Sequence, residues 1–167
     1  MFWLDEIVED ILKKIDPPAG GGSYLITDWK TPSGHIHVGA LRGVIIHDLV
    51  WRGLKAKDKK TAFQYGFDDF DPMDGLPIYV DQSFKKYMGM PLNKVPAPDG
   101  KSKSYAEQFL QEFKKVFNKL GIEPKIALSS AMYQKGEFNE AIKIILDHAQ
   151  DIRRIYKEIS GSDKGDD

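Results

Sequence analysis

The chain has 167 residues, 41% of them hydrophobic, and its 24 Lys and Arg residues nearly balance 25 Asp and Glu residues for a net charge of −1. Length and composition predict one globular domain over residues 1–167; the lack of cysteine excludes disulfides and thiolate metal sites, and no apolar run approaches the roughly 20 residues of a membrane span. With no charge excess to favour nucleic acid and no signal-peptide pattern, we expect a soluble, cytoplasmic protein.

Residues 2–15 predict an amphipathic helix that packs on the body of the domain. The Asp16-Pro17-Pro18 stretch should end this helix, because proline cannot continue it, and the AGGGS stretch at residues 19–23 predicts a flexible connector. The apolar face of the helix carries Phe2, Trp3, Ile7, Val8, Ile11, Leu12 and Ile15.

A strand, a tight loop and a second helix follow in direct succession. The strand covers Tyr24–Thr27, and the loop, called the signature loop below (residues 30–39), reads KTPSGHIHVG. The helix should reach about Leu54, where Gly53 and the Lys-Asp cluster of residues 55–60 close it. The N-terminus of such a helix offers unpaired backbone N–H groups and a partial positive charge, which suit a phosphate chain.

The side chains of the signature loop support the same interpretation. Gly34 and Gly39 let a ligand approach the backbone, and His37 can donate a hydrogen bond to charge that develops on a phosphate. An ordinary strand-to-helix turn with surface histidines is the alternative. The flanking strand, turn and helix favour a nucleotide-phosphate cradle, whose members would be Ser33, Gly34, His35, His37 and Gly39.

A second strand, Thr61–Tyr65, leads into an aspartate-rich loop (residues 66–75). The resulting β-α-β unit favours a parallel pair in a Rossmann-type sheet, which would place both loops side by side at the carboxyl ends of the strands. The carboxylates of the second loop repel one another unless a cation, Mg²⁺ or a substrate ammonium, lies among them; a solvated acidic turn is the alternative. These carboxylates belong to Asp68, Asp69, Asp71 and Asp74.

Residues 76–104 contain many prolines and glycines and predict an irregular insertion with one short helix near Gln82–Met88. Ser104 and Glu107 form a capping box that should begin a helix, and Gly121 should end it. The buried face of that helix should comprise Phe109, Phe113, Val116, Phe117 and Leu120.

The remaining chain predicts a third strand at Pro124–Leu128, a long helix at Glu137–Ile159 and a disordered tail at residues 160–167. That helix should be the longest in the chain. His47 and His148, each on a predicted helix, are interpreted as packing residues, because neither has a second histidine at metal-ligand spacing. The inward face of the long helix should comprise Phe138, Ala141, Ile142, Ile145, Ala149, Ile152, Ile155, Tyr156 and Ile159.

Pro32-Ser33-Gly34 followed by His37-Val38-Gly39-Ala40 resembles the HIGH signature of class I aminoacyl-tRNA synthetases, whose fourth position is usually His or Asn. Further stretches together resemble one branch, the class I lysyl-tRNA synthetases, and cover nearly all of the chain. They are FW near the start, GFDDFDPMDGLP, YMGMPL with PDGKSKSYAEQF, and LGIEPKIALSSAMYQKGEFNEAI.

The resemblance implies an α/β fold with a Rossmann-type (HUP-like) parallel sheet flanked by helices, the first half of a class I synthetase catalytic domain. It implies a lysine–tRNA ligase that uses ATP with Mg²⁺ to activate L-lysine and then charges tRNA(Lys). The implied catalytic residues are His37 and His35, and the chain itself should supply no metal ligands. The implied ATP-binding residues are Pro32, Ser33, Gly34, His35, His37 and Gly39, and the implied lysine-binding residues are Asp28, Asp68 and Asp69.

Synthetases of this family are much longer, with later strands, a KMSKS loop and an anticodon-binding domain. The ISGSDKG stretch at residues 159–165 lacks the first lysine of KMSKS and is interpreted as a chance match. We therefore expect a truncated, minimal or stand-alone relative that retains ATP or lysine binding with weak or no aminoacylation. A non-catalytic binding fragment, a small nucleotidyltransferase of the HIGH superfamily and a tRNA-handling fragment are the alternatives. An open sheet edge would favour a homodimer.

Overall fold

The computed structural model describes residues 2–15 and 22–161, and the chain divides into two compact units after Ser130. The predicted helix end at residues 16–18, most of the predicted connector at residues 19–23 and the predicted tail beyond Gly161 lie outside the described residues.

Three parallel strands form the sheet of the first unit, in the order β1 (Tyr24–Lys30), β2 (Thr61–Phe67) and β3 (Lys125–Leu128). β1 and β2 pair in register from Tyr24 opposite Thr61 to Lys30 opposite Phe67, so their carboxyl ends lie at the same edge. Both strands continue past their predicted ends. The parallel sheet with its helices confirms the predicted α/β, Rossmann-type fold.

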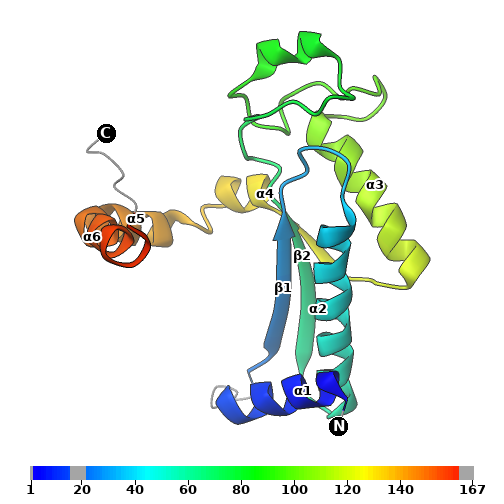
Figure 1. Cartoon of the computed structure of the whole chain (residues 1–167), viewed down its shortest axis with the longest axis vertical. Coiled ribbons are helices and arrows are strands. Elements are labelled where there is room, and N and C mark those ends of the chain that lie inside the picture. The colour runs from blue at the N-terminus through cyan, green and yellow to red at the C-terminus, as the bar shows by residue number, and fades with distance from the viewer. Residues whose placement is uncertain (1, 16–21, 162–167) are drawn as a thin grey trace. The chain divides into compact units, whose positions relative to one another are not determined.

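Two helices, α2 (Val38–Ala56) and α3 (Tyr105–Leu120), cover the same face of this sheet (Figure 1). Trp51 of α2 lies 6.2 Å from Phe63 of β2, and Phe113 of α3 lies 5.7 Å from Tyr65, measured between ring centroids. Alternate residues of a strand point to the same face, so both helices pack on one side. The core between them is built from Tyr24, Ile26, Val44, Val50, Leu54, Phe63, Tyr65, Phe67, Leu110, Phe113, Phe117 and Ile122.

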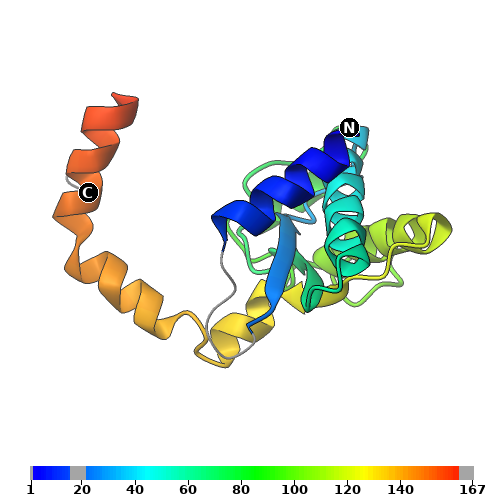
Figure 2. The ribbon, with the colours of Figure 1, turned by 90° about the horizontal axis from the view of Figure 1, so that it is seen from below.

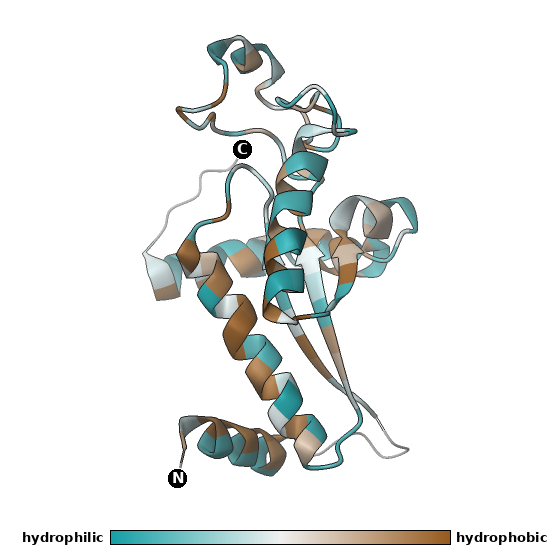
Figure 3. Cartoon of the chain, turned by 90° about the vertical axis from the view of Figure 1, so that its right-hand side faces the viewer, coloured by the Kyte–Doolittle hydropathy of each residue, from teal (hydrophilic) through white to brown (hydrophobic). Residues whose placement is uncertain are grey.

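The first helix, α1 (Trp3–Lys14), crosses the C-terminal end of α2 (Figures 1 and 2). Val8 is buried there, and a Cβ at Gly53 would lie 2.7 Å from its methyl group, so Gly53 permits the two helices to approach. The prediction that Gly53 helps close the helix is therefore wrong. Trp3 at the start of α1 remains 40% exposed. Figure 3, coloured by hydropathy, shows the apolar residues along α2.

The insertion, predicted at residues 76–104, contains the short 3-10 helix η1 (Gln82–Tyr87) and forms a second, smaller core together with Met73 and the start of α3. Ser104 accepts a hydrogen bond from the Glu107 backbone N–H at 3.2 Å, which confirms the predicted cap of α3, and Gly121 ends that helix in a left-handed conformation. Leu120 was predicted to be buried but is 48% exposed. The second core comprises Met73, Val80, Leu92, Val95, Tyr105, Ala106 and Phe109.

The prediction of one long helix over residues 137–159 is wrong. After α4 (Ser129–Gln134), the chain forms α5 (Asn139–Asp147) and α6 (Ala149–Ser160), which are separated at His148. The predicted inward face is also largely exposed, with Ile145 at 54% and Ile159 at 82%. An amphipathic pattern indicates a face that can be buried, but it does not supply the partner.

The described residues contain no helix that is both long enough and apolar enough to span a lipid bilayer.

Candidate active site

The signature loop and the aspartate-rich loop lie side by side, as predicted, at the carboxyl ends of β1 and β2. The Asp68 backbone N–H donates to the Lys30 carbonyl at 3.1 Å, and the Thr31 hydroxyl donates to the Asp71 carboxylate at 2.7 Å. The first contact continues the strand pairing beyond β2, and the second joins the two loops directly. A ligand at this edge of the sheet would therefore meet residues of both loops.

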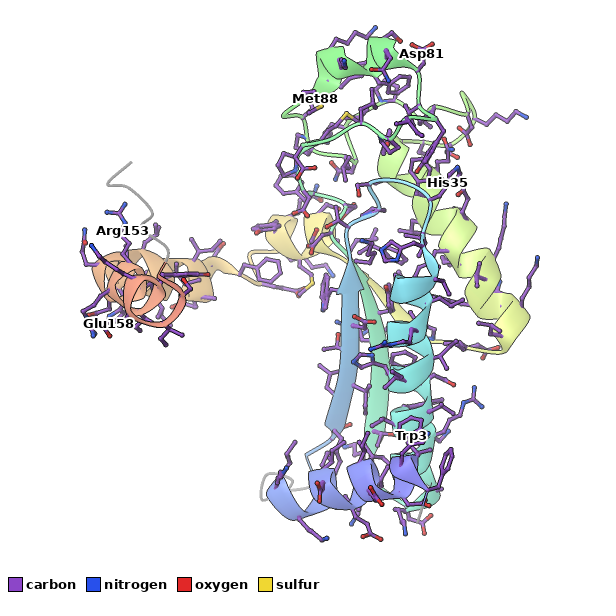
Figure 4. All side chains as sticks on the ribbon, in the orientation of Figure 1. Trp3, His35, Asp81, Met88, Arg153 and Glu158 are labelled. Carbon is purple, nitrogen blue, oxygen red and sulfur yellow. The ribbon has the colours of Figure 1, made fainter. Side chains whose placement is uncertain are left out.

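His35, labelled in Figure 4, is held by side chains from outside the β-α-β unit. Its Nδ1 lies 2.7 Å from Glu112 Oε2 of α3, so the ring donates to that carboxylate. The ring also stacks on Tyr79, with centroids 4.4 Å apart, and meets the edge of Phe109 at 5.3 Å. These contacts already occupy the ring of a residue predicted to bind ATP.

The residues just before His35 are held in a similar way. The Tyr105 hydroxyl donates to the Ser33 carbonyl at 3.0 Å. Burial, and secondarily the nearby Tyr79, raise the pKa of Tyr105 to about 12, so this phenol keeps its donor proton at neutral pH. A Cβ at Gly34 would lie 2.5 Å from the Tyr79 hydroxyl oxygen, so a side chain at this position would displace Tyr79. Pro32 is buried.

His37 differs from His35 in its surroundings. It is the N-cap residue of α2, with extended backbone, and its side chain makes no capping hydrogen bond. The ring packs over Gly39, where a Cβ would lie 2.9 Å from His37 Nδ1. The first turn of α2 carries no acidic residue, so its backbone N–H groups remain favourable for an anion.

A cavity of about 260 Å³ opens beside His37, between β1 and the start of α2. It joins the predicted phosphate-binding residues His37 and Gly39 to Asp28, a predicted lysine-binding residue. The lining residues are Asp28, Trp29, Lys30, His37, Gly39, Ala40, Gly43 and Tyr65.

Asp28 lies within β1, not at its end as predicted, because the strand continues to Lys30. Its carboxylate lies over Gly43, where a Cβ would be only 2.8 Å from Asp28 Oδ2. The same Oδ2 lies 3.6 Å from His47 Nδ1. His47 Nδ1 donates to the Gly43 carbonyl at 2.7 Å. Burial, with a smaller effect of the Asp28 charge, raises the pKa of Tyr65, so a neutral phenol adjoins this carboxylate.

The four aspartates of the second loop have separate environments. Asp69 is buried and accepts hydrogen bonds from the Ser130 backbone N–H at 2.9 Å and from the Ser130 hydroxyl at 2.6 Å, with the Ser129 hydroxyl at 3.3 Å. Asp71 accepts from Thr31, and Asp74 is exposed. The pKa of Asp68 is raised, first by burial and then by the charge of Asp71, which outweigh a hydrogen bond from Ser129.

The predicted repulsion persists within this loop, because the charge of Asp71 still raises the pKa of Asp68. Among the residues that the structure describes, no group of three His, Asp or Glu side chains converges to hold a metal ion.

Tyr79, Tyr105 and Glu112 were missed as functional candidates, as was the Ser129-Ser130 pair. The two serines had a signal that was not used, because they directly follow a predicted strand at the ligand edge of the sheet. Tyr79 and Glu112 had none, since they lie 44 and 77 residues beyond His35 in the sequence.

The parallel sheet, the glycine-histidine loop and the helix capped by His37 are those of an α/β protein of the class I synthetase type. The family model for class I tRNA synthetases (K) matches residues 1–167. The chain therefore belongs to that family.

Curated relatives agree with this family. The chain is 37% identical to a lysine–tRNA ligase of Methanosarcina barkeri over 96% of its own length, and 33% identical to one of Methanocaldococcus jannaschii over 100%. It is 35% identical to one of Archaeoglobus fulgidus over 96%. The chain spans 29% of the first relative and 31% of each of the other two.

Proposed function

We propose that this chain supplies the ATP- and lysine-binding residues of a lysine-activating site, the first step of a lysine–tRNA ligase. The observation that carries the proposal is the cavity beside α2. It places a histidine and an unobstructed helix N-terminus, which suit phosphate, next to the Asp28 carboxylate, which suits an ammonium.

In this proposal, ATP lies along the signature loop with its phosphates toward the first turn of α2. His37 donates a hydrogen bond to the phosphate whose charge increases in the transition state, and Gly39 lets the phosphate approach the backbone. The ring of His35 is committed to Glu112, so we assign His35 to holding the loop rather than to the phosphate.

A lysine molecule carries two ammonium groups, and strand β1 and the aspartate-rich loop offer carboxylates for them. Asp28 lines the cavity, and Asp68 lies on the adjoining loop with a raised pKa that a bound cation would lower again. Asp69 was also predicted to bind lysine. Since both of its oxygens already accept hydrogen bonds from Ser129 and Ser130, we assign it to placing Asp68.

The reaction needs positioning and charge stabilisation but no general base. A lysine carboxylate oxygen attacks the α-phosphorus in line, the bond to the bridging oxygen of the β-phosphate breaks, and pyrophosphate leaves with the electron pair. The carboxylate is already ionised, so no proton moves in this step. Mg²⁺ would accompany the phosphates of ATP, and lysyl-adenylate would then be consumed by tRNA(Lys).

Lysine-dependent ATP–pyrophosphate exchange tests this proposal. We expect exchange that requires lysine and that falls by about 10²-fold in His37→Ala, the usual loss for a donor to developing charge. His148→Ala removes an exposed histidine of the second unit and should change nothing. If exchange is absent but ATP or lysine raises the melting temperature, the chain binds without catalysis. If neither ligand has any effect, the proposal is wrong.

We also propose self-association through the free edge of β1. Within the described residues, β1 has a strand partner on its β2 side alone, and Leu25 beside that edge is 59% exposed. Unpaired backbone groups along a sheet edge favour pairing with a second chain. Sedimentation velocity across a concentration series should show a dimer; a monomer throughout would contradict this.

A further inference from the structure

We infer that Tyr79 of the insertion is a positioning residue, which holds the signature loop so that His37 faces the phosphates of ATP. This inference rests on the proposed function. It concerns a residue outside the β-α-β unit and outside the cavity lining.

Tyr79 contacts the loop through both its hydroxyl group and its ring. Its hydroxyl oxygen accepts a hydrogen bond from the His35 backbone N–H at 2.7 Å. Its ring stacks on the His35 imidazole at a centroid distance of 4.4 Å and an interplanar angle of 31°. Its hydroxyl also fills the space above Gly34, where a side chain would otherwise stand. A chance contact would not be expected to combine a backbone hydrogen bond, a ring contact and close packing over a glycine.

The insertion holds Tyr79 in place from the other side. The next residue, Val80, is 5% exposed and belongs to the second core, and its backbone N–H donates to the Pro77 carbonyl at 3.0 Å. The preceding residue, Ile78, is 97% exposed. Tyr79 is therefore the one side chain of this three-residue stretch that turns onto the signature loop.

Tyr79 is part of a wider support for the loop. Tyr105, which belongs to the same second core, holds the Ser33 carbonyl, and Glu112 of α3 holds the His35 ring. Two backbone groups and one side chain in three consecutive residues are thus fixed by the insertion and α3. His37 follows only two residues later, so a displacement at His35 reaches it through at most about 7 Å of chain.

The chemistry of activation makes this support useful. Activation by positioning depends on the placement of the phosphate donor to within a fraction of an ångström. A loop anchored at Ser33 and His35 but unanchored at the His37 ring keeps the backbone in place and leaves the donor accessible. We therefore expect loss of the Tyr79 side chain to weaken ATP binding and to slow ATP–pyrophosphate exchange without unfolding the domain.

Two variants of Tyr79 and one control test the inference in the full chain. Tyr79→Phe keeps the stacking and removes the acceptor for the His35 N–H, and Tyr79→Ala removes both. Tyr87→Phe is the matched control, because Tyr87 lies in the same insertion and packs against Phe84 instead. The readouts are amide hydrogen exchange of residues 33–37, ATP affinity, and the KM and kcat of ATP–pyrophosphate exchange.

We expect Tyr79→Phe to speed hydrogen exchange of the His35 amide. It should also raise the Kd for ATP by about threefold to tenfold, the amount that one neutral hydrogen bond supplies. Tyr79→Ala should do more, and Tyr87→Phe should do neither. An unchanged His35 amide in Tyr79→Phe would show that the contact does not hold the loop. A loosened loop with unchanged ATP affinity and kinetics would overturn positioning while leaving the proposed function intact. If the wild-type chain shows neither ATP binding nor ATP–pyrophosphate exchange, both the proposed function and this inference are wrong.

Discussion

Two parts of the signature loop, a first half at residues 32–35 and a second half at residues 36–39, differ in what holds them. In the first half, Ser33 and His35 are bound by three side chains of the insertion and α3. In the second half, His37 makes no capping hydrogen bond and lines a cavity. Two histidines separated by one residue thus have opposite situations. One is committed to the protein, and the other is available to a ligand.

This difference teaches that a short sequence motif can contain both an anchor and a group that we propose as the working group. The anchor depends on parts of the chain far from the motif, namely the second core and the buried face of α3. The working group depends on local structure, since His37 is placed by the end of β1 and the start of α2. Damage to α3 should therefore reach the first half, and damage to His37 should leave the fold intact.

The largest effect is expected when the support of the anchored half is removed. Phe113 is 2% exposed and lies 4.5 Å from Phe117 and 5.7 Å from Tyr65 between ring centroids. Phe113→Ala should lower the free energy of unfolding by about 3–5 kcal/mol, because it leaves a cavity between α3 and the sheet. Denaturant titration measures this.

The matched control for Phe113→Ala is Ile144→Ala on α5, whose side chain is 59% exposed. It should change the unfolding free energy by less than about 0.5 kcal/mol. Equal effects of the two substitutions would contradict the assignment of α3 to the core that supports the loop.

The two histidines themselves provide the next test. His37→Ala should slow ATP–pyrophosphate exchange by about 10²-fold through kcat, because it removes a donor to developing charge. His35→Ala should reduce exchange by about tenfold at most and act chiefly through ATP binding, because it loosens an anchor. Steady-state kinetics of both variants in parallel measure the contrast. If His35→Ala were the more damaging to kcat, the assignment of the two roles would be reversed.

A third prediction concerns the aspartate-rich loop, which shows the same division. Asp69 is buried and bound by Ser129 and Ser130, whereas Asp74 is exposed. Asp69→Asn should destabilise the protein by about 1–3 kcal/mol, because an amide cannot accept at both positions and leaves buried donors unpaired. Asp74→Asn, with the same chemical change, should have little effect on the melting temperature. A harmless Asp69→Asn would show that these hydrogen bonds do not hold the loop.

The sequence predicted the features that arise locally. Alternation, helical periodicity and the Pro-Ser-Gly turn placed the β-α-β unit, and parallel pairing then brought the loops of Thr31 and Asp71 together. The capping box at Ser104 was predicted for the same reason, since its partners lie within one turn.

The features that depend on distant contacts were not predictable in this way. Nothing in the pattern around Tyr79 indicates that its hydroxyl meets the His35 backbone, because the turn that carries it is fixed by the separate second core. Asp68 and Asp69 look alike in sequence, and only the fold assigns one to a buried hydrogen-bond site. The prediction of one helix over residues 137–159 was wrong for another reason. The apolar periodicity of the sequence continues through His148, where the structure separates α5 from α6.

The smallest expected effect is on the pH dependence of stability, which should distinguish Asp68 from its hydrogen-bonded neighbour Asp69. Burial and the charge of Asp71 raise the pKa of Asp68 in the folded chain. Between its unfolded and folded pKa values, the native state binds more protons than the unfolded state, so stability falls as the pH rises through this window. Asp68→Asn should therefore stabilise the chain at pH 7, by less than about 1 kcal/mol because the group is partly exposed.

The gain from Asp68→Asn should vanish near pH 3, roughly a unit below the usual carboxyl range, where Asp68 is protonated in both states. Thermal unfolding of the wild type and the variant at the two pH values measures the difference. A variant that is less stable than the wild type at pH 7 would contradict the raised pKa. If Asp68 binds a lysine ammonium, the same substitution should also weaken lysine binding, so that a group unfavourable for folding is favourable for the ligand. Asp69→Asn should show the opposite stability change, which separates the carboxylate proposed to bind lysine from the structural one in a single pair of variants.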